Sequence, residues 1–148
     1  MDIESVKVLT VERLLEGIGG LGVEAAPSAK LTVMVGDTVR IKMGVDYRGT
    51  AIDGTIHVTY GQQDTWFNED GNKQKDIAVH FDSSMDWKSY TFTADVYIGG
   101  SPGTNYDLYA KIIGVPGADI FTPTYLNVLD VLGAAEFRNF AITSYEKI

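Results

Sequence analysis

The sequence predicts an all-β fold, an antiparallel sandwich of two sheets with about seven to eight strands and an extension at each end. Three observations predict it. From residue 30 onward, apolar side chains recur at every second position, which is the period of a strand with one buried face. The alternating runs are short and are separated by Gly, Pro, Asn and Asp, which favour tight turns. No helical period lies between them, so a parallel sheet with helical crossovers is not expected.

The clearest alternation lies in residues 38–48, TVRIKMGVDYR, where apolar side chains share one face: Val39, Ile41, Met43, Val45 and Tyr47. Further runs repeat this pattern at residues 30–35, 55–60, 76–81, 89–98, 105–112 and 124–131. Residues 30–132 are therefore the predicted sandwich, and their turn-separated runs suit an immunoglobulin-like order of strands.

Two segments lie outside the predicted sandwich. Residues 1–29 are predicted as an N-terminal arm with a short strand, a helical turn over residues 11–16 and a glycine-rich hinge. Residues 133–148 are predicted as a C-terminal strand or arm that pairs at an edge of the sandwich or on a neighbour. The side chains expected to bind a partner are Val6, Val8, Leu14, Leu15, Phe137, Phe140, Ile142 and Tyr145.

Size, composition and charge exclude several kinds of site and disfavour several classes of partner. The chain has 148 residues, which is the size of one domain with its own core. It contains no cysteine, so disulfides, thiolate metal sites and thiol nucleophiles are excluded. A formal charge of -8 disfavours nucleic acid and anionic membranes as partners. The N-terminal residues lack the pattern of a secretory signal, and no run of apolar residues is long enough to span a membrane.

Residues 99–103 read G-G-S-P-G and match the G-x-S-x-G pattern of serine hydrolases. That pattern requires a strand, a sharp turn and a helix, with an oxyanion stabilised by the backbone N–H that follows the serine. Pro102 follows Ser101 and has no N–H. We therefore predict a turn between two strands, in which Ser101 is not a nucleophile.

Residues 17–22 match the G-x-G-x-x-G pattern of dinucleotide sites, but Pro27 and then a strand pattern follow instead of a helix. We interpret them as the hinge. His57 and His80 take the outward phase of their strands and are expected on the surface, without the convergent ligands of a metal site. Asp64, Asn68, Glu69 and Asp70 lack the spacing of a calcium loop, and weak calcium binding by this loop stays open. No cofactor and no metal are expected.

Aromatic side chains are the remaining candidates for a binding site. Trp66 lies in a long loop, Trp87 lies at the start of a strand, and Tyr97 and Tyr109 are out of phase with the buried positions. A pleated strand presents such side chains to solvent. Exposed rings stack on sugars or anchor a protein partner, although rings at strand ends also cover the rim of a core.

A family resemblance is carried by residues 35–49, VGDTVRIKMGVDYRG, and residues 101–112, SPGTNYDLYAKI. In these residues the chain resembles the immunoglobulin-like domains of prokaryotic surface proteins and phage virions. The resemblance covers about residues 30–132. It implies binding or assembly and carries no catalytic residues. Tyr106 stands where such folds often place a tyrosine that bonds back to the preceding loop.

Three functions follow from these observations. The first is a non-enzymatic structural protein, a virion decoration, tail or surface-filament subunit, whose partners are further copies or other subunits. The alternative is a carbohydrate-binding module that uses Trp66, Trp87, Tyr97 or Tyr109. An enzyme ranks last, because no nucleophile, base and orienting group can be assembled. The expected setting is a virion or an extracellular surface, and a cytoplasmic setting stays open.

Overall fold

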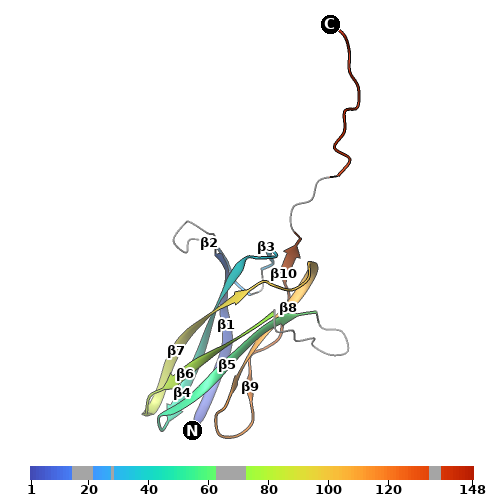
Figure 1. Cartoon of the computed structure of the whole chain (residues 1–148). Coiled ribbons are helices and arrows are strands. Elements are labelled where there is room, and N and C mark those ends of the chain that lie inside the picture. Colours follow the sequence, from blue (N-terminus) through green and yellow to red (C-terminus); the bar gives the residue numbers. More distant parts are fainter. Residues whose placement is uncertain (15–21, 28, 63–72, 134–137) are drawn as a thin grey trace.

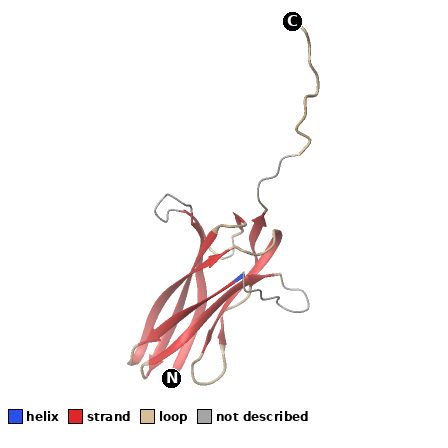
Figure 2. Cartoon of the chain, viewed as in Figure 1, coloured by secondary structure: helices blue, strands red, loops and turns tan. Residues whose placement is uncertain are grey.

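Two β-sheets face each other and enclose a continuous apolar core (Figures 1 and 2). The computed structural model describes residues 1–14, 22–27, 29–62, 73–133 and 138–148. These residues contain no α-helix, and so none that could cross a membrane. The all-β sandwich predicted from the alternation is confirmed.

The first sheet has the strand order β2-β1-β4-β7, and the second has the order β3-β10-β8-β5-β6, with β9 paired to β8. The strands of the first sheet are β1 (Asp2–Leu14), β2 (Gly22–Ala25), β4 (Thr38–Gly49) and β7 (Ser84–Tyr97). Those of the second are β3 (Leu31–Met34), β5 (Ile52–Gly61), β6 (Gln74–Phe81), β8 (Gly103–Ile113), β9 (Ile120–Phe121) and β10 (Tyr125–Leu132). Each predicted run falls on one of these strands and extends at most one residue beyond it at either end. Pairing is antiparallel throughout except between β3 and β10, which run parallel.

The core lies between the alternate faces that the sequence pattern singles out. All five predicted inward side chains of β4 are buried. Opposite them lie the buried faces of β5 and β8, at Ile56, Val58, Tyr60, Tyr106, Leu108, Ala110 and Ile112. Aromatic rings from both sheets meet inside, for example Tyr47 and Phe81, whose ring centroids are 4.8 Å apart. Contacts of this kind add to the stabilisation that comes from burying the rings.

The N-terminal segment differs from the prediction. It forms β1, which lies between β2 and β4, so it is a central strand and not an arm. The helical turn expected over residues 11–16 is wrong at residues 11–14, which are strand. The physical reason is a pair of β-bulges, between Glu4 and Lys7 and between Val8 and Thr10, each of which inserts one extra residue opposite β4. Val8 and Val11 therefore both face the core at a spacing of three, which resembles a helical period.

The turn that contains Ser101 joins β7 to β8, as predicted. The Tyr106 hydroxyl donates a hydrogen bond to the backbone carbonyl of Ser101 at 2.6 Å, which confirms the expected bond from this tyrosine to its loop. Gly103 makes this contact sterically feasible, since a Cβ there would lie 2.9 Å from the Tyr106 hydroxyl oxygen. Ser101 is therefore a turn residue whose carbonyl anchors a buried ring.

Replacing Tyr106 with phenylalanine should lower the free energy of unfolding by about 1 kcal/mol, because the ring stays while its hydrogen bond to Ser101 is lost. Urea denaturation followed by tryptophan fluorescence measures the change. Tyr97→Phe is the matched control, because Tyr97 is exposed, and it should stay within about 0.5 kcal/mol of wild type. Equal effects of the two variants would contradict a structural role for the Tyr106 hydroxyl.

Candidate functional site

The C-terminal segment, residues 138–148, is the most exposed apolar part of the described chain. It follows β10, forms no strand, and extends away from both sheets (Figure 1). Phe140, Ile142 and Tyr145 are 100%, 86% and 96% exposed, and Ile148 is exposed as well. Three of the predicted partner-binding side chains are therefore brought together on one accessible segment. The eighth strand that was one of the two expectations for this region is not formed over residues 138–148.

The sandwich does not use these side chains, since its core is filled by residues that precede the segment. Burying a large apolar side chain contributes roughly 2 kcal/mol. Burial of several such side chains against a partner would therefore contribute substantially to the free energy of binding. The segment also has the composition for strand pairing, because β-branched and aromatic residues dominate its middle.

The predicted N-terminal binding residues lie elsewhere. Val8 is 4% exposed and belongs to the core, so its assignment to a partner surface is wrong. Val6 is half-buried and packs against the core, and Leu14 is half-buried at the end of β1. The physical reason is again the pairing of β1 with β4, which buries one face of the segment. Leu15 and Phe137 lie outside the described residues.

The aromatic candidates form no common platform among the described residues. Trp87 and Tyr97 are both exposed on the outward side of β7, but they are ten positions apart along the strand, a distance of roughly 33 Å. Tyr109 lies on β8 of the other sheet. Trp66 lies outside the described residues. The stacking surface expected from these residues is therefore divided between distant positions.

Tyr109 has an aromatic neighbour that sequence reasoning missed. The Phe121 ring, exposed on β9, lies 5.9 Å from the Tyr109 ring at an interplanar angle of 36°. The Lys111 ammonium lies 5.6 Å from the Phe121 ring centroid and 4.0 Å from the Asp119 carboxylate. Pairing of β8 with β9 creates this group, and no spacing in the sequence signals it.

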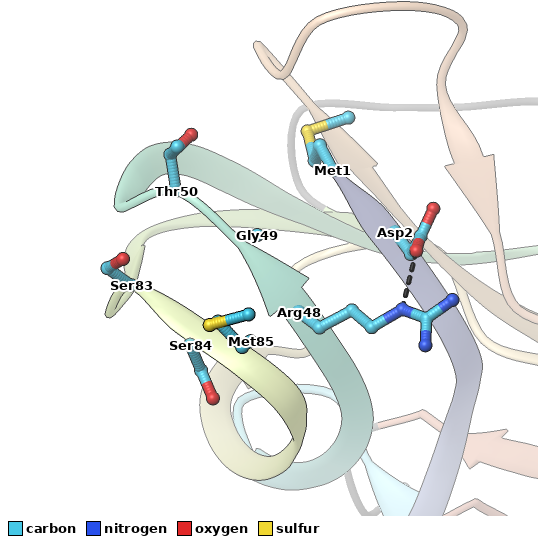
Figure 3. Close-up of a pocket in the computed structure, with 8 residues that line it drawn as sticks. All are labelled: Met1, Asp2, Arg48, Gly49, Thr50, Ser83, Ser84 and Met85. Carbon is cyan, nitrogen blue, oxygen red and sulfur yellow. Dashed lines mark hydrogen bonds and ion pairs between the residues drawn. The ribbon is translucent and has the colours of Figure 1, made fainter.

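A second group lies where β1 begins, at the end of the sandwich far from the C-terminal segment (Figure 1). The Arg48 Nε donates to the Asp2 carboxylate at 2.6 Å, and its guanidinium carbon lies 4.5 Å from the Trp87 ring centroid. The arginine lowers the pKa of Asp2. Beside this pair is an open hollow of about 420 Å³ (Figure 3), whose lining residues are Met1, Asp2, Arg48, Gly49, Thr50, Ser83, Ser84 and Met85.

This hollow offers an ion pair, hydroxyl groups and the exposed Met85 side chain. The Ser84 hydroxyl donates to the backbone carbonyl of Asp86 at 2.7 Å, so it is engaged locally rather than aligned with a base. The geometry suits a polar contact with a partner. Asp2 and Arg48 are 46 positions apart in the chain, and only the register of β1 on β4 brings them together.

The two histidines occupy neighbouring strands but do not face each other. His57 lies opposite Asp76, with its Nδ1 2.5 Å from the carboxylate, and is buried, so the expectation of a surface position is wrong. His80 is exposed, with its Nδ1 2.6 Å from Asp53 and its Nε2 3.3 Å from Asp82. Within the described residues, no three His, Asp or Glu side chains are grouped to hold a metal.

Two further motif interpretations lie outside the described residues. These are the loosely calcium-like loop at residues 64–70 and the glycine-rich hinge at residues 17–22, of which Gly22 alone is described. Gly22 begins β2.

No protein-family model matches this chain, and a search of curated proteins finds no match. Among solved structures, the crystal structure of the C-terminal domain of wzt is similar, with a TM-score of 0.52 and 14% sequence identity. The match covers 95% of this chain and 84% of that one. At this identity the likeness shows the fold alone, a β-sandwich.

We expect His80 to titrate above its ordinary pKa of 6.5, because its hydrogen bond to Asp53, with help from the charge of Asp82, favours the imidazolium. Its contribution to stability is then complete below about pH 6.5 and is lost as the pH rises through the higher folded-state pKa. An NMR titration of the imidazole should give a pKa above 6.5 in wild type and a lower one in Asp53→Asn. Asp95→Asn, on the other sheet, is the control and should leave this pKa unchanged; a lowered value there would contradict the assignment.

Proposed function

We propose that this chain is a non-enzymatic structural protein that assembles with further copies or other subunits through residues 138–148. The observation that carries the proposal is the near-complete exposure of Phe140, Ile142 and Tyr145 on a segment that leaves the sandwich. Apolar side chains gathered on an accessible surface mark a site of protein interaction. A virion or an extracellular surface is the proposed setting, in line with the resemblance to immunoglobulin-like decoration, tail and surface-filament domains.

The sandwich supports this proposal by being complete without the segment. Its core is closed by strands that end at Leu132, so docking of residues 138–148 on a neighbour removes nothing from the fold. The net charge of -8 keeps copies apart at long range, so association depends on a specific short-range contact. An extended segment that docks on a folded neighbour satisfies that requirement.

Ile142→Asp should disrupt assembly, because it places a charge where an apolar side chain is buried in the contact. Loss of roughly 2 kcal/mol corresponds to a dissociation constant about 30-fold higher. Sedimentation equilibrium over a series of concentrations measures it. Thr143→Asp is the matched control, with the same charge on the neighbouring exposed residue, and it should have a smaller effect. A wild-type chain that remains monomeric at every concentration would contradict the proposal.

A second candidate function, glycan binding, is favoured by the inclined ring pair of Tyr109 and Phe121 with Lys111 and Asp119 beside it. Aromatic rings next to polar groups suit a sugar, which has an apolar face and hydroxyl edges. On a glycan array, Phe121→Ala should lose any signal of the wild-type chain, whereas Tyr97→Ala on the other sheet should keep it. An array on which wild type gives no signal removes this candidate.

A further inference from the structure

We infer that the C-terminal segment of one copy pairs with the outer edge of β7 in a second copy, as a further strand of the first sheet. This inference rests on the proposed function, because it names the acceptor for the segment described there. Addition of a strand to a sheet edge uses backbone hydrogen bonds for affinity and alternate side chains for specificity. The acceptor must therefore be a long edge that presents apolar positions.

Edge length singles out β7. The first sheet ends in β2 and β7, and the second ends in β3 and β6. In the described residues, β2 and β3 have 4 residues each, β6 has 8 and β7 has 14. Residues 138–148 require about the length that β7 offers, since a paired strand advances about one residue for each residue of its partner. The other edges would leave part of the segment unpaired.

The middle of β7 also lacks the features that protect sheet edges. Residues 89–94, SYTFTA, contain no charged residue, proline or glycine. Pairing of β7 with β4 continues without a bulge from Thr38 opposite Tyr97 to Tyr47 opposite Lys88. Natural edges are usually interrupted by such residues or by bulges, because an unprotected edge recruits other strands. The uncharged stretch 139–145 of the C-terminal segment matches this edge in length and composition.

Two aromatic side chains on this edge are only partly covered. Tyr90 and Phe92 occupy inward positions of β7 and yet are only half-buried, whereas the inward positions nearer the end of the strand, Ala94 and Val96, are buried. The two rings stack at 6.0 Å, and each also contacts Phe81 of β6. A strand added beside β7 would cover these two rings.

One register places Phe140 and Ile142 opposite two inward positions of β7. With the segment antiparallel to β7 and Ile142 opposite Phe92, Phe140 falls opposite the small side chain of Ala94. Phe140 and Ile142 then both point toward the core of the acceptor copy, because side chains two positions apart share a face. Pairs of an aromatic and a β-branched residue directly opposite each other are favourable across strands.

The same register pairs opposite charges. Glu146 falls opposite Lys88, whose side chain is half-exposed and lies 3.2 Å from Asp82. An ammonium has three donors, so Lys88 can bind a second carboxylate. A parallel alignment with the same central pair would instead place Arg138 opposite Lys88, two like charges that repel. Charge therefore selects the antiparallel direction.

The resulting contact is heterologous, because the segment and the β7 edge are different surfaces of the chain. Each copy then offers one free segment and one free edge, and association continues until a ring closes or a filament grows. Such an assembly is consistent with the structural role proposed above.

Disulfide trapping tests the contact, because the chain has no cysteine of its own. Thr91 and Thr143 are both exposed and lie opposite each other in this register. Directly opposite residues of antiparallel strands have Cα atoms about 4.5 to 5.5 Å apart, within the range of a disulfide. Mixing Thr91→Cys with a mass-tagged Thr143→Cys under mild oxidation should give a mixed disulfide. Ala78→Cys, exposed on β6, is the control acceptor and should give none.

Charge exchange supplies an independent measurement. Lys88→Glu and Glu146→Lys should each raise the dissociation constant about fivefold, and the double variant should recover most of the loss.

A disulfide to Ala78→Cys rather than Thr91→Cys overturns the inference, and so does an intrachain disulfide in a monomeric Thr91→Cys/Thr143→Cys chain. If Ile142→Asp disrupts assembly while the Thr91 to Thr143 disulfide does not form, this acceptor is wrong and the proposed function stands. A wild-type chain that does not assemble overturns both.

Discussion

The contact between the buried face of β4 and the facing sheet is the interaction on which the rest of the structure depends. Five alternate side chains of β4 lie in the core, and its two backbone edges pair with β1 and β7. Burial of that face fixes the register of both neighbours, because a slip of one residue would turn the buried side chains of the slipped strand to solvent. The positions of Arg48 beside Asp2 and of Trp87 beside Arg48 follow from those two registers.

The alternation was sufficient to predict seven of the eight strands described in residues 30–132, all but the two-residue β9, and it failed where a bulge or a covering group intervenes. In β1, the extra residue between Val8 and Thr10 brings Val8 and Val11 to the same face, and a single sequence contains no signal that separates this from a helical spacing. His57 obeys the outward phase, yet it is buried opposite Asp76, because phase determines the face of the sheet and not what covers that face.

The candidate site also contains residues that the sequence predicts and contacts that it does not. Phe140, Ile142 and Tyr145 could be singled out from sequence, since they fall outside the strand frame, and they are exposed. Contacts between strands could not be found, such as the Tyr109 and Phe121 rings or the Asp2 and Arg48 pair, because they depend on which strands are neighbours and in what register. Within a strand that has no bulge, a sequence read in isolation gives the face of each residue, but it does not give the residue opposite.

The free edge of β7 and the C-terminal segment are each prone to non-specific association when they are uncovered. An edge strand with an uncharged middle exposes unpaired backbone groups and half-buried rings, and in isolation it promotes indiscriminate pairing. An apolar segment without a surface to cover promotes the same. In the proposed contact each of these features covers the other, and the flanking charges restrict which strand is accepted and in which direction. A chain with a net charge of -8 can then remain soluble and still associate through one defined edge, because long-range repulsion opposes every contact that lacks this complementarity.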